Sequence, residues 1–229
     1  MLPKFKRKQG YAIMRPGPLI RRLFGPCEHS VAEAYRHIFV DLDDFARLIH
    51  AWVPEAHKIL EVGCGEGAMT ERITRTYPTA VVTAIDITPK VGRLFRGDRF
   101  NVTFCQEAVE DVASRQPASF DLVILADVIH HVPADVRPSL ISAIDQAMTP
   151  NGSFIFKDWV VSKTPIHRLC DMSDRYLTGD DVSYCTTSVI NGLLEPFGPG
   201  TIRQTATVRP WKNNVAVLVQ RLPLSLMER

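Results

Sequence analysis

The sequence lacks any apolar run of the roughly 18 residues that a membrane-spanning helix needs. Its charged start, Met-Leu-Pro-Lys-Phe-Lys-Arg-Lys, is not followed by the apolar segment of a secretory signal. The 5 cysteines form no C-x-x-C pair, so the sequence indicates neither a zinc site nor a disulfide framework, and no metal is expected. These absences predict a globular protein of the cytoplasm.

Acidic side chains are missing from residues 1–27, a stretch that contains 7 Lys and Arg residues. The whole chain has 27 basic and 25 acidic residues, so the remainder carries a small net negative charge. A basic arm on such a body would suit an anionic partner: a membrane surface, an acidic carrier protein or nucleic acid. The alternative is an arm that is simply solvated.

What the sequence does have is a short apolar strand followed by glycines at alternate positions, in Lys58-Ile-Leu-Glu-Val-Gly-Cys-Gly-Glu-Gly67. Glycine permits positive φ angles and lets a ligand approach the backbone closely. A helical run begins near Ala68, and the first N–H groups of a helix are free to bind a ligand. The stretch therefore predicts a nucleotide-binding corner.

The glycines alone do not define the ligand of this corner. Gly63, Gly65 and Ala68 satisfy the dinucleotide pattern G-x-G-x-x-G/A. Glu61, however, places an acid at the end of the strand, where a carboxylate would repel a pyrophosphate and suit a cationic group. The sequence thus favours a cofactor with a positively charged end, and a nicotinamide cofactor is the alternative.

Further strands and helices are expected along the chain. Asp86 ends the strand predicted over 80–86 and lies 19 residues after Gly67, near the spacing of acids that bind ribose hydroxyls. Residues 120–126, which are apolar except for Asp121, are typical of a parallel strand covered on both faces. Other elements follow from apolar periodicity and turn residues: strands over 102–105, 153–156, 201–208 and 215–220, helices over 138–148 and 186–194, and turns at 149–152 and Asn213-Asn214.

Five segments between residues 57 and 160 resemble, in order and spacing, the motifs of class I (Rossmann-like) methyltransferases that use S-adenosylmethionine (SAM), of the UbiE-like small-molecule type. The segments are 61–67, 86–87, 107–108, 126–132 and 148–156. The resemblance implies a doubly wound α/β fold, with a mostly parallel seven-stranded sheet, a C-terminal antiparallel hairpin and N-terminal lid helices. It also implies SAM as the cofactor and S-adenosylhomocysteine (SAH) as its product.

The same resemblance suggests how the chain is divided. Residues 1–50 would hold the basic arm and the lid helices, and residues 51–229 the methyltransferase domain with a substrate insertion at about 158–200. Apolar side chains recur at helical spacing from Val31 to Ile49, which predicts one long helix or two short ones ending before Pro54.

The cofactor contacts are implied motif by motif. The glycine loop would wrap the methionine end of SAM, the motif II acid would bind the ribose, and the residues after the third strand would contact the adenine. The implied residues are Glu61, Gly63, Cys64, Gly65, Gly67, Asp86, Ile87, Glu107, Ala108, Ala126 and Asp127. Glu107 stands where the family often has Asp, so its contact with the adenine amino group is less secure, and a solvated loop acid is the alternative.

Contacts with the methyl acceptor are expected from the lid and the insertion. These are polar or aromatic side chains, namely Tyr35, Arg36, His37, His167, Asp171, Asp174, Arg175, Tyr176 and Tyr184. Asp171 and Arg175 are four residues apart and would alternatively form an exposed ion pair on a helix. Tyr35 would alternatively pack in the core.

Methylation of an oxygen calls for a group that accepts its proton. His167 is the first candidate because it lies in the insertion and titrates near neutrality, and His131 is the second. His130 and His131 are adjacent on a predicted helix, so their side chains should face different ways and should not share a metal ion.

The favoured acceptor is the oxygen of a small molecule, either lipid-like, carrier-tethered or a natural product. No Asp/Asn-Pro-Pro-Tyr/Phe tetrapeptide follows the fourth predicted strand, and the family uses that tetrapeptide for exocyclic or amide nitrogens. Three alternatives stay open: a nucleic-acid methyltransferase that uses the basic arm, a nicotinamide-dependent oxidoreductase, and a non-catalytic binding protein.

Overall fold

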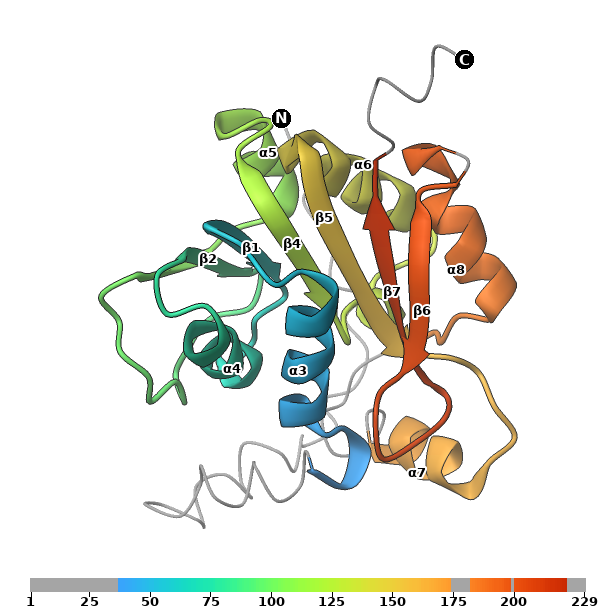
Figure 1. Cartoon of the computed structure of the whole chain (residues 1–229). Helices are drawn as coiled ribbons and strands as arrows, with labels where there is room; N and C mark the ends of the chain where they lie inside the picture. Colours follow the sequence, from blue (N-terminus) through green and yellow to red (C-terminus); the bar gives the residue numbers. More distant parts are fainter. Residues whose placement is uncertain (1–36, 174–181, 199, 222–229) are drawn as a thin grey trace, which may run out of the picture.

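The computed structural model describes residues 37–173, 182–198 and 200–221. Seven strands form one sheet in the order β3-β2-β1-β4-β5-β7-β6 (Figure 1). The strands are β1 (Lys58–Val62), β2 (Val81–Asp86), β3 (Val102–Gln106), β4 (Phe120–Ala126), β5 (Met148–Trp159), β6 (Ile202–Thr207) and β7 (Asn214–Gln220). Strands β1 to β5 are parallel, and β7 runs antiparallel to both β5 and β6. The predicted α/β fold, a mostly parallel seven-stranded sheet with a C-terminal antiparallel hairpin, is confirmed.

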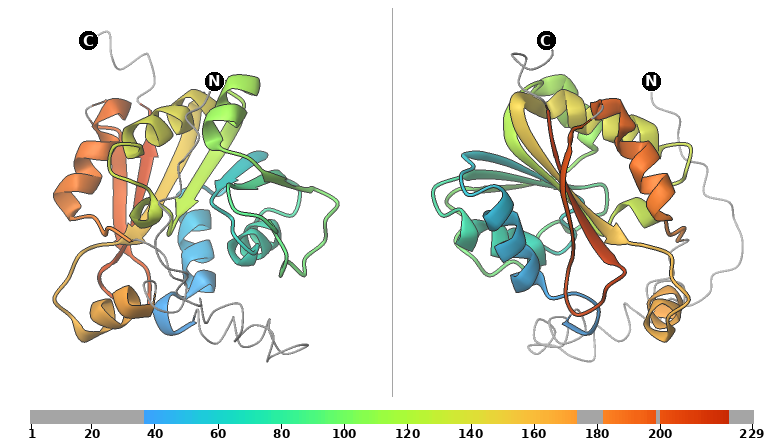
Figure 2. Two further views of the ribbon diagram at one scale, coloured as in Figure 1. Left: turned by 180° about the vertical axis from the view of Figure 1, so that it is seen from behind. Right: turned by 45° about the vertical axis from the view of Figure 1, so that its right-hand side comes forward.

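Helices cover both faces of the sheet (Figures 1 and 2). They are α3 (Leu42–Trp52), α4 (Ala68–Thr76), α5 (Val109–Arg115), α6 (Arg137–Ala147), α7 (Pro165–Ser173) and α8 (Thr187–Leu194), with 3₁₀ turns η2 (Ile129–His131) and η4 (Glu195–Phe197). Helices α3 and α4 lie on one face, and α5, α6 and α8 lie on the other. In the described part of the chain, no helix combines the length and apolar character needed to cross a membrane.

Each face of the sheet builds its own core because successive side chains of a strand point to opposite faces. In β4, Leu122 and Ile124 pack with α3 and α4, whereas Val123 and Leu125 pack with α5, α6 and α8. All four side chains are fully buried. This two-sided burial explains why the segment is apolar in the sequence apart from Asp121.

The helical pattern over residues 31–49 corresponds to two helical segments and not to one long helix. Residues 37–39 are helical, the helix is interrupted at Val40 and Asp41, and α3 begins at Leu42. The Asp41 carboxylate caps α3 by accepting a hydrogen bond from the Asp44 N–H at 2.8 Å. Because Phe45 and Ile49 are almost completely buried against the sheet, α3 belongs to the core.

Three local predictions need correction. Strand β5 begins at Met148 and includes the residues predicted as a turn, because its register with β4 shifts between Phe120 and Leu122 and takes up the extra residues. Asn214 opens β7, so the β6–β7 connection is longer than a tight hairpin. His130 and His131 form the separate turn η2 and do not open α6.

The connection from β2 to β3 contains no helix over residues 87–101, all of which the structure describes. Its packing depends on rings: Phe95 meets Phe104 of β3 edge to face at 5.2 Å, and the Arg99 guanidinium lies over both. Gly92 is required there, because a Cβ on it would lie 2.4 Å from the Phe104 ring. Because this connection supplies no helix to cover it, edge strand β3 is only half-buried.

Candidate active site

A cavity of about 430 Å³ lies at the carboxyl ends of the central parallel strands. This edge is where open α/β sheets bind their ligands. The lining comes from the α3 side, the β1–α4 corner, the end of β4, the end of β5 and helix α7: Phe39, Val40, Leu42, residues 61–66, Ala68, Met69, Ala126, Asp127, His130, His131, Trp159 and Cys170. Segments far apart in sequence therefore meet around one space.

The glycine corner is held tightly against its neighbours. The N–H groups of Gly63 and Cys64 both donate to the carbonyl oxygen of Ile85 in β2, at 2.8 and 2.9 Å. Gly63 has φ = 77°, and a Cβ built on it would lie 2.2 Å from a methyl carbon of Val128. Only glycine fits this backbone conformation and this close approach.

Glu61 presents a buried carboxyl group to the cavity. Its residue is 3% exposed, and its Oε2 atom has no hydrogen-bond partner among the described residues. Burial raises the pKa of Glu61 to about 7, the Thr70 hydroxyl opposes this rise, and the charge of Asp86 adds to it. An unpaired carboxyl oxygen in a buried wall is stabilised by a cationic ligand group, so Glu61 fits the methionine ammonium of SAM.

Asp127 follows β4 in a left-handed conformation, with φ = 57°. Both of its carboxylate oxygens accept hydrogen bonds from the Lys157 ammonium, at 2.7 and 2.6 Å. The Asp127 N–H also donates to the Lys157 carbonyl at 2.9 Å. Lys157 is 0% exposed, whereas the Asp127 side chain is 33% exposed and lines the cavity. Within this pair the negative charge of Asp127 is therefore already balanced, unlike that of Glu61.

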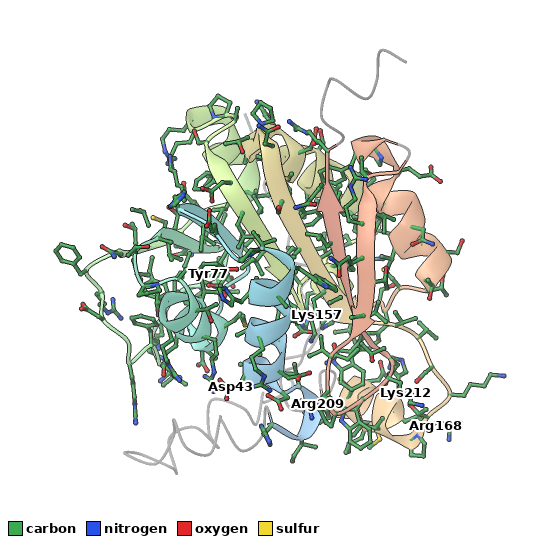
Figure 3. All side chains as sticks on the ribbon, viewed as in Figure 1. Asp43, Tyr77, Lys157, Arg168, Arg209 and Lys212 are labelled. Atoms are coloured by element: carbon green, nitrogen blue, oxygen red, sulfur yellow. The ribbon has the colours of Figure 1, made fainter. Side chains whose placement is uncertain are left out.

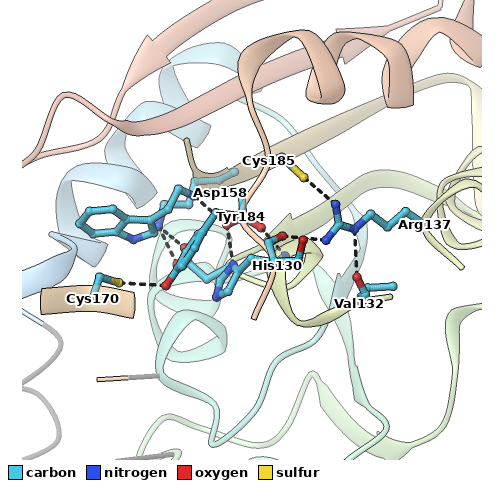
Figure 4. A network of polar contacts seen from close by, with 11 residues as sticks. His130, Val132, Arg137, Asp158, Cys170, Tyr184 and Cys185 are labelled. Atoms are coloured by element: carbon cyan, nitrogen blue, oxygen red, sulfur yellow. Dashed lines mark hydrogen bonds and ion pairs between the residues drawn. The ribbon is translucent and has the colours of Figure 1, made fainter. Parts of the chain in front are cut away.

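His130 is fixed by a buried carboxylate (Figure 4). Its Nδ1 lies 2.6 Å from Asp158 Oδ1, and its backbone N–H donates to Asp158 Oδ2 at 3.3 Å. The Trp159 N–H donates to the same carboxylate at 2.7 Å. Burial opposes ionisation of Asp158, but His130 and the Lys157 ammonium bring its pKa below the ordinary value. An ionised Asp158 makes Nδ1 the protonated nitrogen of His130, so Nε2 is the nitrogen that can take up a proton.

Two rings contact that of His130. Tyr184 stacks on one side with ring centroids 4.9 Å apart, and the His131 ring lies 4.1 Å away. The prediction that the paired histidines face different ways is wrong, since a 3₁₀ turn brings their rings together. Among the described residues, no cluster of three or more His, Cys, Asp or Glu could hold a metal ion.

The predicted cofactor residues fall into two groups. Six of them line the cavity: Glu61, Gly63, Cys64, Gly65, Ala126 and Asp127. The others lie beside it, toward β2 and β3. Asp86 accepts hydrogen bonds from the N–H groups of Gly65 and Thr88, both at 2.8 Å, and from the Thr88 hydroxyl at 2.6 Å.

The adenine end of the implied cofactor site lies beyond Asp86. Ile87 is 74% exposed, as a side chain that packs against a bound ring would be. Glu107 forms an ion pair with Arg115 at 2.9 Å, and Ala108 caps α5. The ion pair holds the Glu107 carboxylate, so a contact of Glu107 with adenine would have to compete with Arg115. Gly67 is the N-cap of α4.

The predicted acceptor residues are only partly described. His37, His167, Asp171 and Tyr184 are described, whereas Tyr35, Arg36, Asp174, Arg175 and Tyr176 lie outside the described residues. His167 is 8% exposed and packs against the rings of Tyr184 and Trp159, behind the cavity wall. His131 lines the cavity directly.

The sequence pointed to His130 only as one of a pair of histidines, and it assigned no roles to Lys157 and Asp158. The available signal was a polar pair, Lys157-Asp158, at the end of an apolar strand that reaches the ligand-binding edge. Their partners lie 28 and 30 residues away in the sequence, and only the pairing of β4 with β5 brings them together.

The fold and the corner define an α/β domain of the kind that binds a nucleotide-bearing cofactor at the carboxyl edge of its sheet. Residues 59–152 match the family model described as a methyltransferase domain. The match assigns a methyltransferase domain to these residues, the segment in which the sequence motifs were found.

Named relatives agree with this assignment. The ubiquinone biosynthesis O-methyltransferase of Xanthomonas campestris pv. campestris (strain B100) is 35% identical over 112 residues, covering 47% of this chain and 44% of that protein. The demethylspheroidene O-methyltransferase of Rhodobacter capsulatus is 27% identical over 205 residues, covering 84% of this chain and 50% of that protein. The chain thus spans about half the length of these curated relatives.

A solved structure shows the same fold over most of its length. It is the Burkholderia thailandensis 1,6-didemethyltoxoflavin-N1-methyltransferase, crystallised with 1,6-didemethyltoxoflavin and SAH. It is 16% identical, with a TM-score of 0.62 over 90% of this chain and 88% of that one. At this identity the likeness concerns the fold alone.

Proposed function

We propose that this chain transfers the methyl group of SAM to an oxygen atom of a small-molecule acceptor. The observation that carries the proposal is the unpartnered Glu61 carboxyl oxygen in the wall of a cavity that also contains His130. Both curated relatives are named O-methyltransferases, which supports oxygen as the accepting atom.

The chain's own residues would hold SAM along the carboxyl ends of β1, β2 and β4. Glu61 would bind the methionine ammonium, Asp86 the ribose hydroxyls, and Ile87 would cover the adenine. The sulfonium of bound SAM makes its methyl group electrophilic, so the protein's task is to align the acceptor and exclude water.

An oxygen acceptor must lose a proton during the transfer, and the cavity offers a group for it. His130 has a buried carboxylate on Nδ1, which stabilises the imidazolium that forms when Nε2 takes up a proton. This arrangement supports His130 ahead of the two sequence candidates. His131 also lines the cavity, and His167 lies behind its wall.

Substitution of Asp86 by alanine is expected to weaken SAM binding by about 10- to 100-fold, because hydrogen bonds between a carboxylate and the ribose hydroxyls are lost. Calorimetric titration measures the change, with thermal unfolding to confirm that the variant folds. Asp135→Ala, at an exposed acid in the turn before α6 that does not line the cavity, is the matched control and should leave the affinity unchanged. Tight NAD binding, or equal SAM affinity in both variants, would contradict the proposed site.

SAM affinity is expected to depend on pH through Glu61. The ligand-free pKa is about 7, and a bound ammonium favours the ionised carboxylate. Binding below pH 7 therefore includes the cost of deprotonation, which makes SAM roughly ten-fold weaker at pH 6 than at pH 8. Titrations of wild type and Glu61→Gln across this range test the prediction.

The ratio of the SAM affinities of wild type and Glu61→Gln isolates the contribution of the Glu61 carboxyl group, since the amine of SAM titrates identically with both proteins. The Glu61→Gln variant should bind more weakly at pH 8, and its disadvantage should shrink toward pH 6. A ratio that stays constant with pH would remove Glu61 from the ammonium site.

Two alternatives from the sequence carry less support. The family match is to methyltransferases, which speaks against a nicotinamide oxidoreductase. The basic arm on which a nucleic-acid substrate would depend lies outside the described residues, so its anionic partner and the cytoplasmic location stay predictions. Salt-dependent RNA binding that is lost on deletion of residues 1–22 would favour that alternative.

A further inference from the structure

A second hollow, larger than the cavity, lies between helix α7 and the β6–β7 connection. This groove has a volume of about 810 Å³ and is open to solvent. Its walls are mainly apolar: Pro165, Ile166 and Leu169 on one side, and Pro210 and Trp211 on the other. Leu169 is 50% exposed although it is a large apolar side chain. An apolar hollow of this size is more costly to leave in water than scattered apolar residues, and it suggests a ligand.

Only a thin wall separates the groove from the cavity. Leu169 of the groove and Cys170 of the cavity are neighbours on α7. Trp211 of the groove donates its indole N–H to the Ile38 carbonyl at 2.6 Å, and the next residue, Phe39, lines the cavity.

A third link lies at the end of β5. Asn213 of the groove accepts a hydrogen bond from the Val160 N–H at 2.8 Å, and the preceding residue, Trp159, lines the cavity. At three separate places, then, the two hollows are one residue apart. The groove therefore lies directly beside the cavity.

The two hollows differ in chemistry. The cavity contains the ionisable side chains Glu61, Glu66, Asp127, His130 and His131. Among the described lining residues of the groove, Lys212 is the one charged side chain; Figure 3 shows it on the β6–β7 connection, beside α7. A ligand matched to both has a polar reactive head and an apolar chain.

We propose that the groove binds the apolar chain of the methyl acceptor, an acyl or prenyl chain of roughly eight carbons or more, while the hydroxyl-bearing head enters the cavity. The inference rests on the proposed methyl transfer and adds the substrate class to it. The position of the groove beside the cavity at three points favours this occupant over a protein segment, since a protein partner would have no reason to dock next to His130.

The test uses n-alkyl esters of 4-hydroxybenzoic acid, from methyl to octyl, titrated into the full chain saturated with SAH. Each buried methylene stabilises binding by up to three- to four-fold, and an open groove should realise about half of that free energy. We expect affinity to rise by about 100-fold from the methyl to the octyl ester.

Substitutions on α7 locate the effect. Leu169→Gln makes one wall polar and should reduce the gain from methyl to octyl to under about ten-fold, while leaving methyl-ester affinity unchanged. Met172→Gln is the matched control: Met172 is 55% exposed on the same helix but does not line the groove. It should retain the full gain. A general loss of structure would instead weaken all esters equally.

Each outcome decides the matter. Equal affinity for all esters, no binding of any ester, or identical gains in the two variants would overturn the groove assignment. A dimer that Leu169→Gln dissociates, without chain-length dependence, would assign the groove to self-association. Failure to bind SAH, measured first without esters, would instead contradict the proposed methyl transfer itself.

Discussion

A Gly63→Ala variant should lose about 3–5 kcal/mol of unfolding free energy and bind SAM at least about 100-fold more weakly. The added Cβ would lie 2.2 Å from a Val128 methyl carbon, far inside contact distance. The residue would also have to hold φ = 77°, which L side chains rarely adopt. Because the neighbouring N–H groups anchor the corner to Ile85, the strain cannot be relieved by a small local shift.

Chemical denaturation and SAM titration measure the two effects. Gly192→Ala is the matched control: the added Cβ would meet nothing within 4 Å, and Gly192 lies inside helix α8. That variant should gain about 0.5–1 kcal/mol from helix propensity.

A double variant separates the two causes of the loss. Gly63→Ala with Val128→Ala removes the overlap but keeps the backbone strain, so it should recover part of the stability. If Gly63→Ala were as stable as Gly192→Ala, the tight contact between the corner and Val128 would be wrong.

Asp127→Asn should destabilise the protein by about 3 kcal/mol, and by more than Lys157→Met does. Asp127→Asn is expected to be the more destabilising substitution because Lys157 is 0% exposed. Loss of its partner leaves a buried ammonium without its charge-assisted hydrogen bonds. The Asp127 side chain is 33% exposed and can hydrate when Lys157 is replaced. Asparagine tolerates the left-handed backbone at position 127, so the substitution changes charge with little change in conformation.

Denaturation in the absence of ligand compares the two single variants with the double variant. The double variant should be about as stable as Lys157→Met alone, since both charges of the pair are then gone. A larger loss for Lys157→Met than for Asp127→Asn would contradict the assigned burial of this pair.

The sheet was predictable because its strands have local signatures in the sequence. Residues 120–126 are apolar apart from Asp121, since β4 is covered on both faces, and the glycine run marks the turn after β1. The length of β5 was not predictable, since its first residues look like a turn, and the register shift that absorbs them depends on pairing with β4.

The candidate site shows the same division between local and tertiary information. Glu61, Asp86 and Asp127 stand at or next to strand ends, within short motifs, so local sequence and its resemblance to known motifs could point to them. The ion pair of Lys157 and the Asp158–His130 contact join residues about 30 positions apart, and no local pattern encodes them. The groove beside α7 depends on two segments meeting that are about 40 residues apart in the sequence, which periodicity cannot reveal.

The helix-free connection before β3 has a consequence for the energetics of cofactor binding. Edge strand β3 has half-buried side chains, and its Phe104 ring packs with Phe95 and the Arg99 guanidinium. Local opening of β3 should therefore cost less free energy than opening of β4 at the sheet centre. Amide hydrogens of β3 should therefore exchange with solvent sooner than those of β4.

Asp86, Ile87 and Glu107 flank this same edge. A ligand that binds only the closed form adds to the opening free energy according to its concentration and affinity. SAM would then protect β3 from exchange more than it protects β4, and the cofactor would stabilise this edge of the sheet.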